Sequence, residues 1–215
     1  MIMLYLVRHG ETVYNREERI QGHNDSPLTD LGLRQAEAAA DRLAAVPLAA
    51  VYSSDSGRAL ATAEAIASRH NLPVTTSALI REAYLGQVQG LTRGQFEQRY
   101  PKEFRLWRED SVAFRPPGAE RLEDVIQRCG AFLAQVVSGH DDREQIAVAL
   151  HGGSLRGIIC AAFGLPPSFY RCIHLSNGGL TILEVGDPPG IWLLNDTCHL
   201  NSLVADEEDP DNVQR

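Results

Sequence analysis

Long apolar runs and basic clusters are both missing from this sequence of 215 residues. No stretch of 18 consecutive apolar residues occurs, so no segment is expected to span a membrane. The N-terminus also lacks the charged, apolar and small regions of a secretory signal peptide. The formal net charge is −8 and no basic patch is present, which argues against nucleic acid or an anionic membrane surface as a partner. Together these absences predict a cytoplasmic protein.

Cysteine and histidine occur without the spacings that bind metals or form disulfide frameworks. The four cysteines show no C-x-x-C pattern and lie in apolar surroundings, which indicates reduced, mostly buried thiols. Five of the histidines show neither H-x-x-x-H nor H-x-H spacing. The residues concerned are Cys129, Cys160, Cys172 and Cys198, and His23, His70, His140, His174 and His199. No metal site is expected among them.

The composition is typical of one globular domain followed by an acidic segment. Hydrophobic residues make up 44% of the chain and charged residues 22%, as in ordinary soluble proteins. Residues 206–211 hold five acids in six positions, so residues 205–215 are predicted to be an acidic, disordered tail after a single domain at 1–204. Aromatic residues alternate with charges between 92 and 118, and this segment is predicted to be a helical insert or lid because it is too short for its own core. A homodimer is left open.

Hydrophobic periodicity predicts an alternation of strands and helices. The strands are expected at 4–7, 48–52, 73–76, 145–150, 180–185 and 191–194. The helices are expected at 36–46 after an N-cap at Thr29, at 57–70 after an N-cap at Asp55, at 121–137 and at 155–163. This order predicts an α/β three-layer sandwich, with a mostly parallel, doubly wound sheet that carries helices on both faces.

Four of the predicted strands are each followed within a few positions by an ionisable side chain. These side chains are Arg8 and His9 after the first strand, Arg58 after the second, Glu82 after the third and His151 after the fourth. Because the carboxyl ends of parallel strands meet at one edge of a sheet, we expect all of them in one crevice. Two arginines and two histidines would make an electropositive pocket that suits a compact dianion such as a phosphomonoester.

Taken alone, Arg8 and His9 allow two interpretations. In the first, Arg8 is a surface charge and His9 a hydrogen-bonded loop residue; in the second, His9 is a nucleophile and Arg8 binds the anion that it attacks. The rest of the chain favours the second. The motifs are Arg8-His9-Gly10-Glu11-Thr12 with Asn15, Arg19-Ile20-Gln21-Gly22, Pro27-Leu28-Thr29-Asp30-Leu31-Gly32, Ser53-Ser54-Asp55 with Arg58, Thr62-Ala63-Glu64, Glu82, and His151-Gly152-Gly153. In these residues and their order the chain resembles the histidine phosphatase superfamily, in its branch of phosphoglycerate-mutase-like phosphatases.

The resemblance implies a role for each matching residue. His9 is implied to be the nucleophile that carries the phosphoryl group as phosphohistidine. Arg8, Arg58 and His151 are implied to stabilise the charge on the equatorial oxygens, and Glu82 to donate a proton to the leaving alcohol. The positions that match phosphate contacts are Asn15, Gln21, Gly22 and Gly152. The expected partner is a small phosphorylated metabolite, and no cofactor or metal is expected because the arginines supply the positive charge.

The chain departs from the family pattern around the substrate. The loop Gly86–Gly90 lacks the aromatic residue and second acid that such phosphatases often show, and Gly118-Ala119-Glu120-Arg121 replaces their Gly-Gly-Glu-Ser. The substrate therefore stays open.

Two other functions compete with a metal-independent phosphomonoesterase. The alternative enzyme is a phosphoglycerate mutase, which needs a basic lid to hold the glycerate carboxylate. In this chain Trp107 is followed by Arg108 and then by Glu109 and Asp110, which would repel a carboxylate, so the phosphatase is favoured. The other is a catalytically dead binding module, which the complete catalytic set disfavours.

Overall fold

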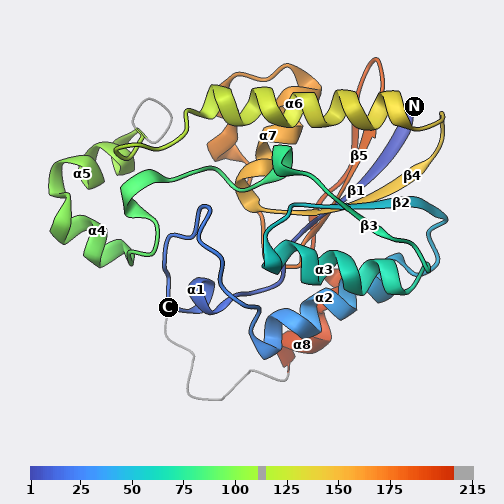
Figure 1. Ribbon diagram of the computed structural model, residues 1–215, viewed down its shortest axis with the longest axis horizontal. Coiled ribbons are helices and arrows are strands. Elements are labelled where there is room, and N and C mark those ends of the chain that lie inside the picture. The colour runs from blue at the N-terminus through green and yellow to red at the C-terminus, as the bar shows by residue number, and fades with distance from the viewer. Residues whose placement is uncertain (111–114, 206–215) are drawn as a thin grey trace.

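The computed structural model describes residues 1–110 and 115–205, and its centre is a six-stranded sheet with the strand order β3-β2-β4-β1-β5-β6 (Figure 1). The strands are β1 (Ile2–Arg8), β2 (Leu48–Ser53), β3 (Val74–Thr76), β4 (Gln145–Leu150), β5 (Leu180–Val185) and β6 (Gly190–Asp196). The strands β1 to β4 run parallel to one another, whereas β5 and β6 are antiparallel. The predicted α/β sandwich with a mostly parallel sheet is therefore confirmed.

Helices cover both faces of the sheet. The α-helices are α1 (Val13–Arg16), α2 (Asp30–Leu43), α3 (Gly57–Ser68), α4 (Arg93–Arg99), α5 (Pro101–Glu109), α6 (Leu122–Gly139), α7 (Gly152–Phe163) and α8 (Asn201–Ala205), and four short 3₁₀ helices lie at Ala78–Ile80, Gly86–Val88, Pro167–Cys172 and Cys198–Leu200. Helices α6 and α7 lie on one face and α2 and α3 on the other (Figure 1). The alternating side chains of β4 explain both layers, because Ile146 and Val148 pack toward α6 and α7 while Ala147 and Ala149 pack toward α2 and α3.

The helical insert is also present. Helices α4 and α5 project beyond one end of the sheet (Figure 1). Phe96, Phe104 and Trp107 pack together with Val88 in a small apolar cluster. Residues 111–114 of the predicted insert lie outside the described residues, as do residues 206–215 of the tail predicted at 205–215, whereas Ala205 is the last residue of α8.

One predicted helix cap is wrong. Helix α3 begins at Gly57 with Ser56 as its N-cap residue, and Asp55 does not cap it. The Asp55 carboxylate instead accepts hydrogen bonds from the Arg81 guanidinium, with Nε 2.7 Å from Oδ1. Thr29 caps α2 as predicted, and its hydroxyl accepts from the Gly32 backbone N–H at 3.0 Å.

Candidate active site

Strand register places the two site histidines side by side. In the parallel β1–β4 pair, Arg8 lies opposite Leu150, so His9 and His151 are the next residues beyond two neighbouring strand ends. Their ring centroids are 5.2 Å apart in an edge-to-face arrangement. On the other side of β4, Ser53 of β2 pairs with Ala149, which brings Ser54 to the same edge. The sheet alone thus brings these side chains together.

The His9 ring has one defined tautomer. Its Nδ1 lies 2.7 Å from the Gly10 carbonyl oxygen, and because a carbonyl only accepts hydrogen bonds, Nδ1 carries the ring proton. Burial, reinforced by the charges of Arg8 and Arg58, holds the pKa of His9 well below its usual value of 6.5. At neutral pH the ring is therefore uncharged, and the lone pair on Nε2 is available.

The Arg58 guanidinium is fixed by the loop that follows α1. Its Nη2 donates to the Gly22 carbonyl at 2.8 Å, and its Nη1 donates to the Asn24 carbonyl at 2.9 Å and to Asp25 Oδ1 at 3.0 Å. The Asp25 carboxylate also accepts from the backbone N–H of Gly57 at 2.7 Å, so it ties this loop to the start of α3. A side chain only 2% exposed is thereby held beside His9.

Arg8 is the second fixed cation. Its Nη1 donates to the Leu175 carbonyl at 2.6 Å. Burial lowers the pKa of Arg8 to about 10, so it remains charged at neutral pH. Among the described residues, neither Arg8 Nε nor Arg58 Nε has a hydrogen-bond partner, although both atoms are buried. Each arginine therefore keeps one buried N–H group that a bound oxyanion could satisfy.

His151 lies behind His9 and is fully buried. Its Nε2 is 2.9 Å from the Ser54 hydroxyl, and its buried Nδ1 has no partner among the described residues. Burial and the nearby Arg58 keep the pKa of His151 well below its usual value. The second imidazole is thus neutral in the free protein.

Glu82 is held at the start of α7. Its Oε2 accepts the Gly153 backbone N–H at 3.0 Å, and its Oε1 accepts the Ala83 N–H at 2.7 Å. The fit at Gly153 is tight, because a Cβ atom there would lie 1.9 Å from Glu82 Oε1 and 2.6 Å from the Tyr170 hydroxyl. A glycine is therefore required for Glu82 to occupy this position.

One cavity of about 450 Å³ unites most of the predicted residues. Seven of the nine line it: Arg8, His9, Asn15, Gln21, Gly22, Arg58 and Glu82. The other two, His151 and Gly152, lie just behind its wall, since a Cβ atom on Gly152 would be 3.6 Å from Arg8 Nε. The buried Oε1 of Gln21 has no partner among the described residues. Gly22 has a φ of +57°, and a Cβ there would lie 2.1 Å from Gln89 Oε1.

Several residues of the site could not be identified from the sequence. Asn177 donates from its amide to the His9 carbonyl at 3.0 Å and to Asn15 Oδ1 at 3.2 Å, although it lies in a loop before β5. Arg93 and Arg156 also line the cavity, as does Trp107. The acids that follow Trp107 are not among its lining residues, and Glu109 lines a separate hollow formed by residues of α4 and α5. The predicted repulsion of a carboxylate by Glu109 and Asp110 therefore has no counterpart among the residues that line the cavity.

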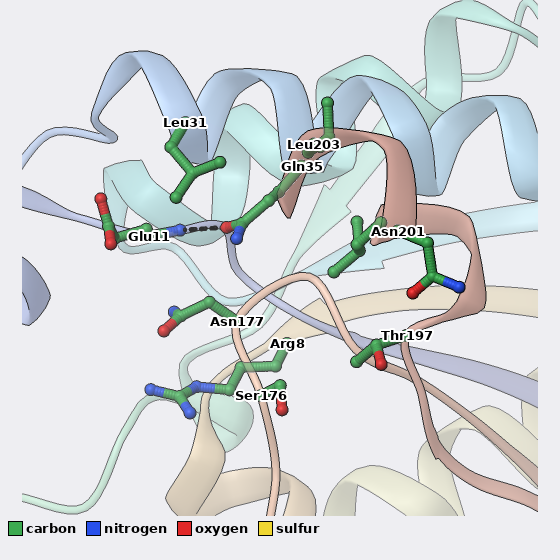
Figure 2. Close-up of a pocket in the computed structure, with 10 residues that line it drawn as sticks. Arg8, Glu11, Leu31, Gln35, Ser176, Asn177, Thr197, Asn201 and Leu203 are labelled. Carbon is green, nitrogen blue, oxygen red and sulfur yellow. Dashed lines mark hydrogen bonds between the residues drawn. The ribbon is translucent and has the colours of Figure 1, made fainter. Parts of the chain in front are cut away.

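A separate cavity lies on the far side of Arg8, next to the C-terminal helix α8. Figure 2 shows Asn177 and the Arg8 side chain on its lower wall and Glu11 and Gln35 above, with the Glu11 backbone N–H donating to Gln35 Oε1 at 2.8 Å. Glu11 is the only acid among the described residues that line it. Of the predicted catalytic residues in the described chain, only Arg8 reaches this cavity.

Comparison with known proteins shows the family of this chain. A sequence model of the histidine phosphatase superfamily (branch 1) matches residues 4–197. The chain belongs to this superfamily. It is an enzyme of the phosphatase and phosphoglycerate-mutase-like kind, as its sequence resemblance implied.

Some of the similar proteins are named as phosphoglycerate mutases and others as phosphatases. A protein of Yersinia pestis (strain Pestoides F) named "Probable phosphoglycerate mutase GpmB" is 32% identical over 96% of this chain and 99% of its own length. The structure of Bacillus stearothermophilus YhfR has a TM-score of 0.86 and 34% identity, covering 93% of this chain and all of YhfR. A mycobacterial glucosyl-3-phosphoglycerate phosphatase has a TM-score of 0.82 and 31% identity, covering 91% of this chain and 99% of that protein. Among the residues that the structure describes, no helix is long and apolar enough to cross a membrane.

Proposed function

We propose that this protein is a metal-independent phosphomonoesterase that hydrolyses a small phosphorylated metabolite through a phosphohistidine at His9. The observation that carries the proposal is the state of the His9 ring. Its Nδ1 donates a hydrogen bond to the Gly10 carbonyl, and the buried, neutral ring lines a cavity together with Arg8 and Arg58. A neutral imidazole with one free lone pair is a nucleophile, and two guanidinium groups bind the oxygens of the group that it attacks.

The reaction follows in two transfers. The His9 Nε2 lone pair forms a bond to phosphorus while the bond from phosphorus to the leaving oxygen breaks, and Glu82 gives that oxygen a proton. Arg8, Arg58 and His151 stabilise the charge on the equatorial oxygens in the transition state, and Asn15, Gln21, Gly22 and Gly152 complete the phosphate site. The oxygen of a water molecule then forms a bond to phosphorus while the bond from phosphorus to His9 Nε2 breaks. The water gives a proton to Glu82, and inorganic phosphate and the neutral His9 are released.

The test uses purified protein and 4-nitrophenyl phosphate with EDTA in excess. We expect turnover to survive the chelator and to be lost in His9→Ala, with the variant's circular dichroism unchanged. Loss of turnover with EDTA, or turnover that persists in His9→Ala, would contradict the proposal.

A second assay addresses the mutase alternative, which the name of the Yersinia relative keeps in view. The protein is incubated with 3-phosphoglycerate and a bisphosphoglycerate primer. Inorganic phosphate as the main product supports the phosphatase, whereas 2-phosphoglycerate as the main product supports the mutase.

A further inference from the structure

A second cavity of about 460 Å³ continues the site beyond Glu82. Five residues line both cavities: Glu82, Leu85, Arg93, Trp107 and Arg156. Because Glu82 belongs to the wall of both, the second cavity lies on the side of Glu82 that the leaving alcohol would occupy. Its lining therefore bears on which alcohol the enzyme accepts.

The lining of this second cavity is strongly cationic. Four arginines contribute to it, namely Arg93, Arg115, Arg156 and Arg171, together with His174, and Glu82 is the one acid among the described lining residues. This is the reverse of the whole chain, whose net charge is −8. Like charges gathered in one hollow repel one another, so such a set is stabilised when a bound anion neutralises part of it.

Arg115 is a half-buried member of this set that holds one buried, unpartnered N–H group. Its Nε donates to the Glu120 carbonyl at 3.0 Å, whereas its buried Nη2 has no hydrogen-bond partner among the described residues. Burial lowers the pKa of Arg115, because desolvation disfavours its charged form. A buried guanidinium N–H without an acceptor is costly in free energy, and a ligand oxygen in the cavity would remove that cost.

Arg156 connects the two cavities. Its Nε donates to the Ile173 carbonyl at 2.7 Å, and its guanidinium carbon lies 5.6 Å from the centre of the Tyr170 ring. Burial and the nearby Glu82 carboxylate raise the pKa of Tyr170, so its hydroxyl stays protonated and can donate a hydrogen bond. Fixed donors thus continue from the phosphate site into the second cavity.

We propose that this second cavity binds an acidic group, a carboxylate or a phosphate, on the leaving alcohol of the substrate, with Arg115, Arg156 and Arg171 as its cationic contacts. The proposal rests on the proposed phosphatase function. It orders the substrate along the cavities: the phosphoryl group lies at His9, the bridging oxygen at Glu82, and the second anion beyond it. It makes the substrate a small metabolite with two anionic groups.

Matched substrate pairs test this assignment. Glycerol 3-phosphate and 3-phosphoglycerate differ only by a hydroxymethyl group in place of the carboxylate, and 3-hydroxypropyl phosphate and propane-1,3-diol bisphosphate differ by a second phosphate. We expect the wild-type kcat/KM to be about tenfold or more higher for the more acidic member of at least one pair, the size expected for one charge-assisted contact. The pair that shows the preference identifies the acidic group as carboxylate or phosphate.

Substitutions test which arginines cause the preference for the acidic substrate. Arg115→Gln and Arg171→Gln are each expected to shrink the ratio between the acidic and the neutral substrate severalfold toward one, and Arg115→Lys to restore part of it. Arg108→Gln is the control, because Arg108 is an exposed arginine in the insert that contains Arg115, and it lines the separate hollow of α4 and α5. Its ratio should equal that of the wild type.

The outcomes separate this inference from the phosphatase function. A wild-type enzyme that hydrolyses 4-nitrophenyl phosphate but prefers neither acidic substrate would overturn the acidic-group subsite and leave the phosphatase intact. If Arg115→Gln and Arg171→Gln both keep the wild-type ratio, these arginines do not bind the acidic group, and the phosphatase function again stays intact. Absence of phosphate release from every substrate, 4-nitrophenyl phosphate included, would instead contradict the phosphatase function itself.

Discussion

Arg128 of α6 holds the backbone of Glu82: its Nη2 donates to the Glu82 carbonyl at 3.1 Å. Its Nη1 donates to the Arg81 and Leu79 carbonyls at 2.7 and 2.8 Å, and its Nε donates to Glu120 Oε1 at 2.7 Å. Glu120 in turn accepts the Tyr84 N–H at 3.1 Å through Oε2. One half-buried ion pair therefore fixes the segment on both sides of Glu82.

Arg128→Gln should impair proton donation more than phosphate binding. The variant leaves several carbonyls of the segment without their donor, so we expect a loss of about 1–3 kcal/mol in the free energy of unfolding. An alkyl phosphate needs a proton on its leaving oxygen, whereas the 4-nitrophenolate anion leaves without one. The kcat should therefore fall about tenfold for glycerol 3-phosphate and much less for 4-nitrophenyl phosphate. Arg121→Gln, at the exposed N-cap of the same helix, is the control. Equal losses for both substrates would show that Arg128 does not position Glu82.

Gly153→Ala should displace the Glu82 carboxylate. The new methyl group would lie 1.9 Å from Glu82 Oε1, which no side chain tolerates, so the carboxylate must leave the Gly153 N–H. We expect kcat for an alkyl phosphate to fall by about 10²-fold, the lower end of what general acid catalysis contributes, and a smaller loss for 4-nitrophenyl phosphate.

Gly94→Ala provides the matched control for that variant. No atom lies within 4 Å of a Cβ at Gly94, which is exposed in α4, so this change should leave kcat intact and stabilise the helix by about 0.5–1 kcal/mol. Unchanged alkyl phosphatase activity in Gly153→Ala would mean that Glu82 is not the proton donor from its observed position.

The stability of the protein should fall as the pH falls below 6.5. Both site histidines have folded pKa values well below that value because they are buried beside arginines, whereas in the unfolded chain they titrate near 6.5. Below pH 6.5 the unfolded state therefore binds protons that the folded state does not, and the free energy of unfolding decreases by up to about 1.4 kcal/mol per pH unit for each histidine. Above pH 6.5 both histidines are neutral in the folded and in the unfolded state, so the stabilisation that they contribute to the free energy of unfolding is fully present.

Urea unfolding at pH 7.5 and 5.5 measures this dependence. His9→Gln and His151→Gln should each reduce the difference between the two pH values, and His174→Gln, at the surface, should not. A wild-type stability that is equal at both pH values would contradict the buried, neutral state of the two imidazoles.

The convergence of the site could be predicted because a parallel sheet determines it. Once His9 and His151 follow adjacent strands, the register of β1 and β4 brings their rings together, and the sequence needs to show only two buried strands that each end in a histidine. The helices could be predicted for a similar reason, since the apolar period of α6 determines which side chains face the sheet.

Contacts between distant loops could not be predicted in this way. Arg115 precedes α6 and Arg171 follows α7. Nothing in their local sequence shows that they line one cavity with Glu82. The error at Asp55 has the same origin: an aspartate before a helix is a good local cap, but a tertiary pair with Arg81 replaces that role. The acids that follow Trp107 in the sequence also predicted a repulsive lid, whereas Glu109 lines a separate hollow and not the cavity at His9.

The central claim is a covalent phosphoryl group on His9, and a rapid-quench experiment tests it most directly. Enzyme mixed with an excess of 4-nitrophenyl phosphate is quenched in alkali within the first turnover, digested, and analysed by mass spectrometry. We predict an acid-labile, alkali-stable phosphate on the peptide that contains His9, and none in His9→Ala. A wild-type enzyme that turns over this substrate with no phosphate on His9, or with the phosphate on another residue, would contradict the account.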